Sequence, residues 1–107
     1  MSWPIGYFEN SRDESPVKDF IKNQEKKLRA KIMHEIDLLE RFGPHLALPH
    51  SRKIENDLWE LRIRGETQVR ILYTFINKTI VLLHVFRKSQ KIPVKELDIA
   101  RDRISQI

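Results

Sequence analysis

The sequence predicts a single α+β domain with a mainly antiparallel, twisted sheet. Three observations lead to this class. A strand-like segment near the N-terminus precedes a helical stretch, the second half holds three consecutive strand-like runs joined by tight turns, and a last helix follows. We expect the helices to be segregated on one face of the sheet. Because 107 residues suffice for one core only, we assign residues 1–107 to one domain.

The first half is predicted to hold a short strand over residues 3–8 and then one long helical region. Ser15 can cap the start of this region, and Pro16 suits its first turn. The region is expected to run to Phe42.

Within the helical region, apolar residues recur at spacings of three and four, which indicates one stripe packed on the sheet. These residues are Leu28, Ile32, Ile36, Leu39 and Phe42. Gly43 and Pro44 are expected to end the helix. A connector follows, with a short extended piece at residues 52–54.

The three strand-like runs are predicted over residues 58–64, 68–76 and 79–88. A turn over residues 65–67 joins the first two, and Asn77 with Lys78 forms a second tight turn. Pro93 then opens a C-terminal helix, on which one face is shared by Leu97, Ala100, Arg101 and Ile104.

The positive charge is concentrated in the second half. Residues 1–57 carry ten basic and ten acidic side chains, whereas residues 58–107 carry ten basic and five acidic ones, so the whole excess of +5 lies there. A basic surface attracts phosphates and other polyanions. The alternative is a soluble surface that happens to be basic.

Two arginines are predicted to face each other across the first hairpin. If residues 65–67 form the turn, Arg62 lies opposite Arg70 and Arg64 lies opposite Gln68. The core-facing positions are then Leu61, Ile63, Val69, Ile71, Tyr73 and Phe75. Like charges directly opposite on a sheet are unfavourable, so the pair indicates an anion-binding site. Alternatively, Arg62 pairs with Glu60 or another acid.

The composition excludes several classes. No cysteine is present, which excludes disulfides and thiolate metal sites, and no cluster of Asp, Glu and His has the spacing of metal ligands. The longest apolar runs are of strand length, and no secretory leader is visible. We expect a cytoplasmic protein with no cofactor, no metal and no membrane contact.

The sequence resembles the RelE/HigB superfamily of bacterial toxins, especially its HigB-like, phage-associated branch. The segments "LWELRI", "VRILY" and "IVLLHVFRKSQ", followed by Pro93 and a helix with Ala100 and Arg103, match the family's motifs. The resemblance covers about residues 3–105. It implies a compact fold of the microbial-ribonuclease type, with two N-terminal helices on one side of the sheet and a C-terminal helix.

The resemblance further implies the toxin component of a type II toxin–antitoxin system. Such toxins cleave messenger RNA, usually on the ribosome, and are neutralised by an antitoxin, commonly of the helix-turn-helix class. A ParE-like toxin acting on DNA gyrase and a non-catalytic RNA-binding domain are the alternatives.

RNA cleavage through the 2′-hydroxyl needs positive charge around the pentacoordinate phosphate, in addition to a general base and a general acid. Arginine is suited to supply the positive charge because its planar guanidinium group can bind two phosphate oxygens. Our first candidate is Arg70, followed by Arg62, with Lys88 approaching from the end of the last strand. Further substrate-binding candidates are Arg64, Arg87, Gln90 and Lys91. Metal-independent cleavage is expected.

The candidates for acid or base are Tyr73 and His84. Tyr73 lies on the core-facing side of its strand, which favours a packing role. His84 lies inside an apolar run, which favours a buried, hydrogen-bonded imidazole. His45 and His50 flank the connector and are weaker candidates.

Overall fold

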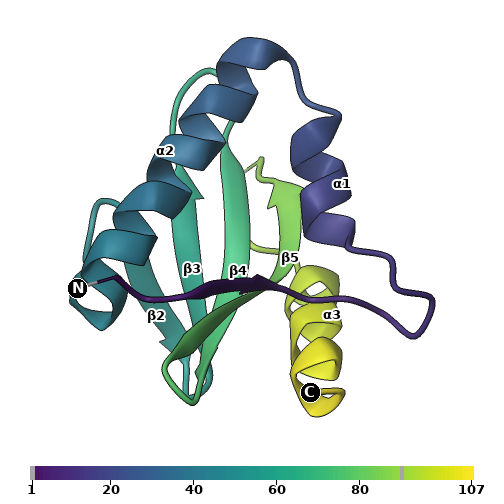
Figure 1. Ribbon diagram of the computed structural model, residues 1–107. Helices are drawn as coiled ribbons and strands as arrows, with labels where there is room; N and C mark the ends of the chain where they lie inside the picture. The colour runs from purple at the N-terminus through teal and green to yellow at the C-terminus, as the bar shows by residue number, and fades with distance from the viewer. Residues whose placement is uncertain (1, 90) are drawn as a thin grey trace.

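The computed structural model describes residues 2–89 and 91–107, and it shows one five-stranded sheet with helices on both faces (Figure 1). The elements are β1 (Ile5–Tyr7), α1 (Pro16–Lys22), α2 (Lys26–Phe42), the 3-10 helix η1 (Gly43–His45), β2 (Ser51–Glu55), β3 (Leu58–Ile63), β4 (Val69–Ile76), β5 (Thr79–Arg87) and α3 (Val94–Ser105). The predicted α+β class is confirmed. No helix among the described residues is both long and apolar enough to cross a membrane.

The sheet has the strand order β1-β5-β4-β3-β2 and is mixed. Strands β2 to β5 pair antiparallel with their neighbours, and β1 runs parallel to β5. The three predicted strands of the second half end within one residue of the observed β3, β4 and β5. The extended piece expected at residues 52–54 is a complete edge strand, β2, because its backbone pairs with β3.

The predicted helical region is divided into two helices by residues 23–25. The backbone N–H of Asn23 donates to Asp19 O and ends α1, and the Glu25 carboxylate accepts from the Leu28 N–H at 3.1 Å and begins α2. Pro16 is the first residue of α1, as predicted. Ser15 occupies the N-cap position, but the expected capping bond from its side chain is absent.

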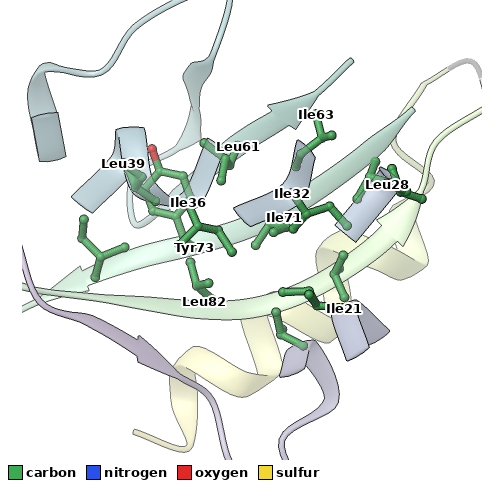
Figure 2. Packing of buried hydrophobic residues seen from close by; sticks show 14 residues of the cluster. Ile21, Leu28, Ile32, Ile36, Leu39, Leu61, Ile63, Ile71, Tyr73 and Leu82 are labelled. Atoms are coloured by element: carbon green, nitrogen blue, oxygen red, sulfur yellow. The ribbon is translucent and has the colours of Figure 1, made fainter. Parts of the chain in front are cut away.

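The main core lies between the two N-terminal helices and one face of the sheet (Figure 2). Four residues of the predicted stripe, Leu28, Ile32, Ile36 and Leu39, are buried in it. Phe42 was wrongly included in the stripe, because its side chain is 45% exposed. It is the last residue of α2, and its ring packs under the guanidinium of Arg41 instead of on the sheet.

Helix α3 packs on the opposite face of the sheet, which corrects the expectation that all helices share one face (Figure 1). Ala100 is buried, and Leu97 and Ile104 pack beside it against a second apolar cluster formed by Leu58, Leu72, Leu83 and Phe86. Arg101, predicted on the same face of the helix, is exposed and pairs with Glu55 and Asp98. Both faces of the sheet are therefore partly covered.

A tight turn connects β4 to β5. Asn77 and Lys78 both adopt left-handed backbone conformations, with φ of 49° and 69°, as expected for a two-residue hairpin turn.

A bulge interrupts the β4–β5 ladder: Leu72 pairs with His84 and Tyr73 pairs with Leu82. Leu83 is therefore the extra residue, and it faces the α3 side together with His84.

Candidate functional site

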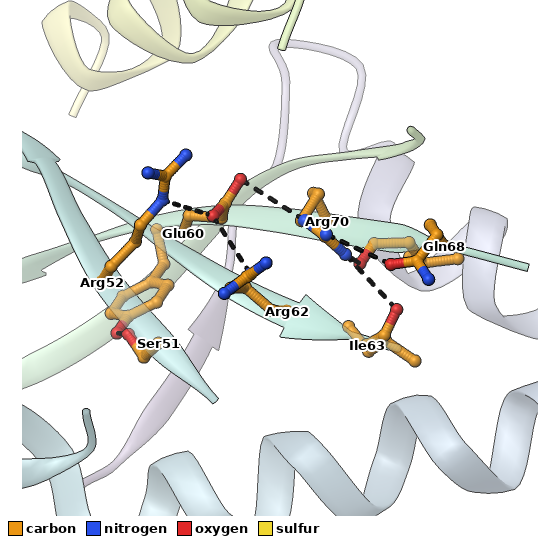
Figure 3. Close-up of polar contacts among 9 residues, drawn as sticks. Ser51, Arg52, Glu60, Arg62, Ile63, Gln68 and Arg70 are labelled. Atoms are coloured by element: carbon orange, nitrogen blue, oxygen red, sulfur yellow. Dashed lines mark hydrogen bonds and ion pairs between the residues drawn. The ribbon is translucent and has the colours of Figure 1, made fainter. Parts of the chain in front are cut away.

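The predicted register of the first hairpin is confirmed, because Arg62 pairs directly with Arg70. Strand alternation places both on the α3 side of the sheet, together with Glu60 and, from edge strand β2, Arg52. We call these four residues the arginine cluster (Figure 3). It contains three guanidinium groups and one carboxylate.

Glu60 lies at the centre of the cluster and is fully buried. Its Oε1 atom accepts a hydrogen bond from Arg52 Nε at 2.9 Å and lies 3.7 Å from Arg62 Nε. Its Oε2 atom lies 3.5 Å from Arg70 Nε (Figure 3). The alternative that Arg62 pairs with Glu60 is thus confirmed. The carboxylate also relieves the repulsion between the opposed arginines.

Arg70, the first candidate from the sequence, lies in the protein interior with 2% of its surface exposed. Its Nη1 donates to the carbonyls of Val69 and Ile63 at 3.0 and 3.4 Å, and its Nη2 donates to the Gln68 side chain at 3.2 Å. Burial lowers the pKa of Arg70, and the nearby Glu60 carboxylate opposes this shift. In this arrangement the guanidinium holds the β3–β4 hairpin, and its catalytic role stays a prediction.

The other two guanidinium groups reach solvent. The side chain of Arg52 is 50% exposed and that of Arg62 is 27% exposed. Three positive charges against one negative charge leave this surface with a net charge of two, which favours binding of an anion such as a phosphodiester. Sequence reasoning missed Arg52, because only the pairing of Arg52 with Glu60 across β2 and β3 shows that they meet.

The remaining basic candidates are dispersed. The backbone N–H of Lys88 donates to Gln68 O at 2.9 Å, which holds this residue at the Arg70 end of the cluster. Arg87 is exposed and donates to the Gln24 side chain between α1 and α2, away from the α3 side. Arg64 borders a pocket beside α2, and Lys91 is exposed in the loop before α3. Gln90 lies outside the described residues.

Tyr73 has the packing role favoured from the sequence. It is 1% exposed on the α2 side of the sheet, where its hydroxyl bonds to that of Ser51 and its ring stacks on Trp59. Burial raises the pKa of Tyr73 to about 12. Because Tyr73 is buried on the α2 side, its hydroxyl lies on the face of the sheet opposite to the arginine cluster.

His84 is a partly buried, hydrogen-bonded imidazole, as favoured from the sequence. Its Nε2 lies 3.0 Å from a Glu96 oxygen, and Arg103 Nη1 lies 3.4 Å from its Nδ1. Arg103 also donates to Leu83 O at 2.7 Å. Burial lowers the pKa of His84, and the Glu96 carboxylate opposes this shift. Both partners belong to α3, so in this structure both ring nitrogens are directed at the helix.

Metal ligation has no support in the side-chain arrangement of residues 2–89 and 91–107. No group of three or more His, Asp or Glu side chains in these ranges lies close enough to hold an ion.

The family follows from comparison with known proteins. Residues 19–105 match the model of the family described as "Phage derived protein Gp49-like (DUF891)". The chain belongs to this family. It is a family of the RelE-like toxin type, so the match agrees with the predicted superfamily at this coarser level. No curated protein matches the sequence significantly.

Proposed function

We propose that this Gp49-like protein is the toxin component of a type II toxin–antitoxin system and cleaves messenger RNA without a metal ion. Within the superfamily, we propose a HigB-like, ribosome-dependent enzyme with a RelE-like fold that acts in the cytoplasm. The observation that carries the proposal is the arginine cluster, in which Glu60 contacts three arginines and two of them remain accessible. The family membership and the excess of basic residues support it.

Attack of a 2′-hydroxyl on the neighbouring phosphate gathers negative charge on the phosphate oxygens. Preorganised cations at that point stabilise the transition state more than the ground state. Arg62 and Arg52 are the groups that can supply these cations, since their guanidinium groups reach solvent. Glu60 is a positioning residue, because it holds both arginines on the same patch of the sheet.

Lys88 is the proposed third cation, at the end of β5, and is a candidate to protonate the leaving oxygen. His84 is a second candidate, but its imidazole must first leave Glu96 to reach a substrate. Tyr73 has no part in the proposed reaction, because it is buried on the other face. The cognate antitoxin is proposed to be a helix-turn-helix protein, as is common among HigB-like toxins.

The first experiment incubates the purified protein with translating ribosomes and maps new messenger RNA ends by primer extension. We expect cleavage by the native chain and a loss of at least 100-fold in the Arg52→Ala/Arg62→Ala double variant. Lys78→Ala is the matched control, because it removes an exposed cation at the far end of the sheet and should retain full activity.

Two further reactions separate the alternatives. Supercoiling by gyrase should be unaffected by the protein, whereas inhibition would favour the ParE-like alternative. Cleavage on preformed, fixed ribosome complexes should persist in excess chelator. RNA binding without new ends would leave only the non-catalytic alternative, and a specific requirement for a divalent ion would contradict metal-independent cleavage.

A further inference from the structure

A pocket of about 360 Å³ lies between α2 and the last residues of β3, around the sheet edge from the arginine cluster. Its lining comes from two elements: Ala30, Lys31, His34 and Glu35 of α2, and Arg62, Ile63 and Arg64 at the end of β3. The volume lies within the range of about 300–1,000 Å³ that is usual for small-molecule sites. The residues of β3 that line the pocket, Arg62 and Ile63, lie beyond Leu61, the last residue of β3 that has a ladder partner in β2.

The pocket carries excess positive charge from both sides. Lys31, Arg62 and Arg64 line it with three cations, and Glu35 is its one acid, so these four side chains together carry a net charge of plus two. The Lys31 ammonium lies close to the backbone of Gly65, so it bridges from α2 to the β3–β4 turn. A phosphate between these cations would offset their mutual repulsion.

Glu35 supplies a hydrogen-bond acceptor to the lining of the pocket. Its side chain is 13% exposed, and its Oε1 atom is paired with His50 Nδ1 at 2.8 Å. Its other oxygen makes no hydrogen bond among the described residues, and it remains an acceptor. Ala30 and Ile63 add apolar surface beside it. The pocket thus offers cations for a phosphate, apolar surface and one hydrogen-bond acceptor. A nucleotide uses all three of these features, whereas an inorganic anion uses the cations alone.

We propose that this pocket is a nucleotide subsite for the RNA strand, in which Lys31 and Arg64 bind a backbone phosphate and Glu35 accepts a hydrogen bond from the base. Adenine, cytosine and guanine carry an exocyclic amino group that can donate to a carboxylate, whereas the one base donor of uracil in RNA is its ring N3–H, flanked by two carbonyl oxygens that a carboxylate repels. The subsite is therefore expected to disfavour uridine.

Arg62 connects the two surfaces. It lines the pocket and also lies 3.7 Å from Glu60 in the arginine cluster. An RNA strand with one nucleotide in the pocket would thus pass over the last residues of β3, beyond their pairing with β2, and bring an adjacent phosphate to the cluster. In this respect the subsite rests on the proposed function, because it takes RNA to be the ligand.

The test measures binding of AMP, CMP, GMP and UMP to the purified chain by isothermal titration or NMR, without ribosomes. We expect UMP to bind about tenfold more weakly than the other three, and Glu35→Gln to reduce this difference. Lys31→Glu and Arg64→Glu should each weaken all four by about tenfold or more. Lys78→Glu, with the same charge change at the opposite end of the sheet, should bind like the native chain.

Each outcome bears on one proposal. Native binding by Lys31→Glu and Arg64→Glu, an equal loss in Lys78→Glu, or no mononucleotide binding at millimolar concentration would overturn the subsite. If the subsite fails in this way, the proposed function would still be supported by ribosome-dependent cleavage that is lost in the Arg52→Ala/Arg62→Ala double variant. Conversely, the expected nucleotide pattern without messenger RNA cleavage would leave the subsite in place and refute the nuclease.

Discussion

Replacing Arg70 tests whether this arginine is a structural or a catalytic residue. Its guanidinium makes three hydrogen bonds, to Val69 O, Ile63 O and Gln68 Oε1, and faces the buried Glu60 carboxylate. We expect Arg70→Met, which keeps most of the side-chain volume, to lower the free energy of unfolding by about 3 kcal/mol. That value is the lower end of the range for breaking a buried ion pair, because Glu60 keeps its bond from Arg52.

Truncation to alanine should be more severe. Arg70→Ala also removes buried methylene groups, each contributing about 0.8 kcal/mol, and leaves a cavity between β3 and β5. The loss then reaches about 4–5 kcal/mol, which is comparable with the whole stability of a small domain, about 5–15 kcal/mol. Arg70→Met is therefore the informative variant.

The assay is urea unfolding followed by circular dichroism, with cleavage measured on the same preparations at a temperature where each variant is folded. Arg12→Met is the matched control, since Arg12 is exposed in the loop before α1 and should change the unfolding free energy by less than about 0.5 kcal/mol. If Arg70→Met has native stability and yet loses cleavage by 100-fold or more, Arg70 contacts the phosphate and our structural assignment is wrong.

Three other predictions concern neighbouring groups. Glu60→Gln should destabilise the protein by about 3 kcal/mol, because it leaves the buried Arg70 uncompensated, and sulfate should restore part of the loss in thermal unfolding. Tyr73→Phe should lower the free energy of unfolding by about 1–3 kcal/mol at pH 7, since the buried Ser51 hydroxyl loses its partner. Cleavage should be unchanged, and a loss of cleavage in the folded variant would restore Tyr73 as a catalytic candidate. The lowered pKa of His84 means that its neutral form is favoured by folding, so this contribution to stability is complete above its unfolded pKa of about 6.5 and is lost as pH falls towards the folded value. Urea midpoints at pH 7.5 and 5.5 should therefore differ less in His84→Gln than in the native chain, and an equal difference would contradict this linkage.

The strands of the second half were predictable because their signals are local. Alternation of apolar residues gave β3, β4 and β5 within one residue, and the turn at Gly65 set the register that opposes Arg62 to Arg70. The division of α1 from α2 also has local causes, Asn23 and Glu25, but no glycine or proline marks it. A break made by polar caps is easily read as continuous helix.

The position of α3 was not predictable from its own pattern. Apolar spacing shows that Leu97, Ala100 and Ile104 share a face, but it does not show which side of the sheet that face meets. The second apolar face consists of Leu72 and Leu83 with their neighbours, and Leu83 reaches it through the bulge in β5. Such a bulge changes the alternation by one residue and leaves no clear sequence signal.

The candidate site was also only partly predictable, because its contacts join residues that are distant in the sequence. The sequence identified Arg62 and Arg70 correctly as opposed residues, but it ranked the buried one first, because exposure depends on which carbonyls and acids surround each guanidinium. Arg52 lies in the extended piece expected at residues 52–54, but nothing local showed which strand this piece pairs with, so its contact with Glu60 required the β2–β3 register. Long-range pairing, and not composition, decides which cations meet.

The geometry of the arginine cluster also ranks its members for phosphate binding. Arg70 is fixed by carbonyl groups and Arg52 donates a 2.9 Å hydrogen bond to Glu60, so moving either one breaks well-formed contacts. Arg62 lies 3.7 Å from the same carboxylate, and its Nε has no hydrogen-bond partner among the described residues. Turning Arg62 towards a phosphate therefore replaces a weak contact by a charge-assisted one. The buried part of the cluster holds the carboxylate and the sheet in place, and the loosely held arginine is the one free to follow a phosphate of the proposed RNA substrate.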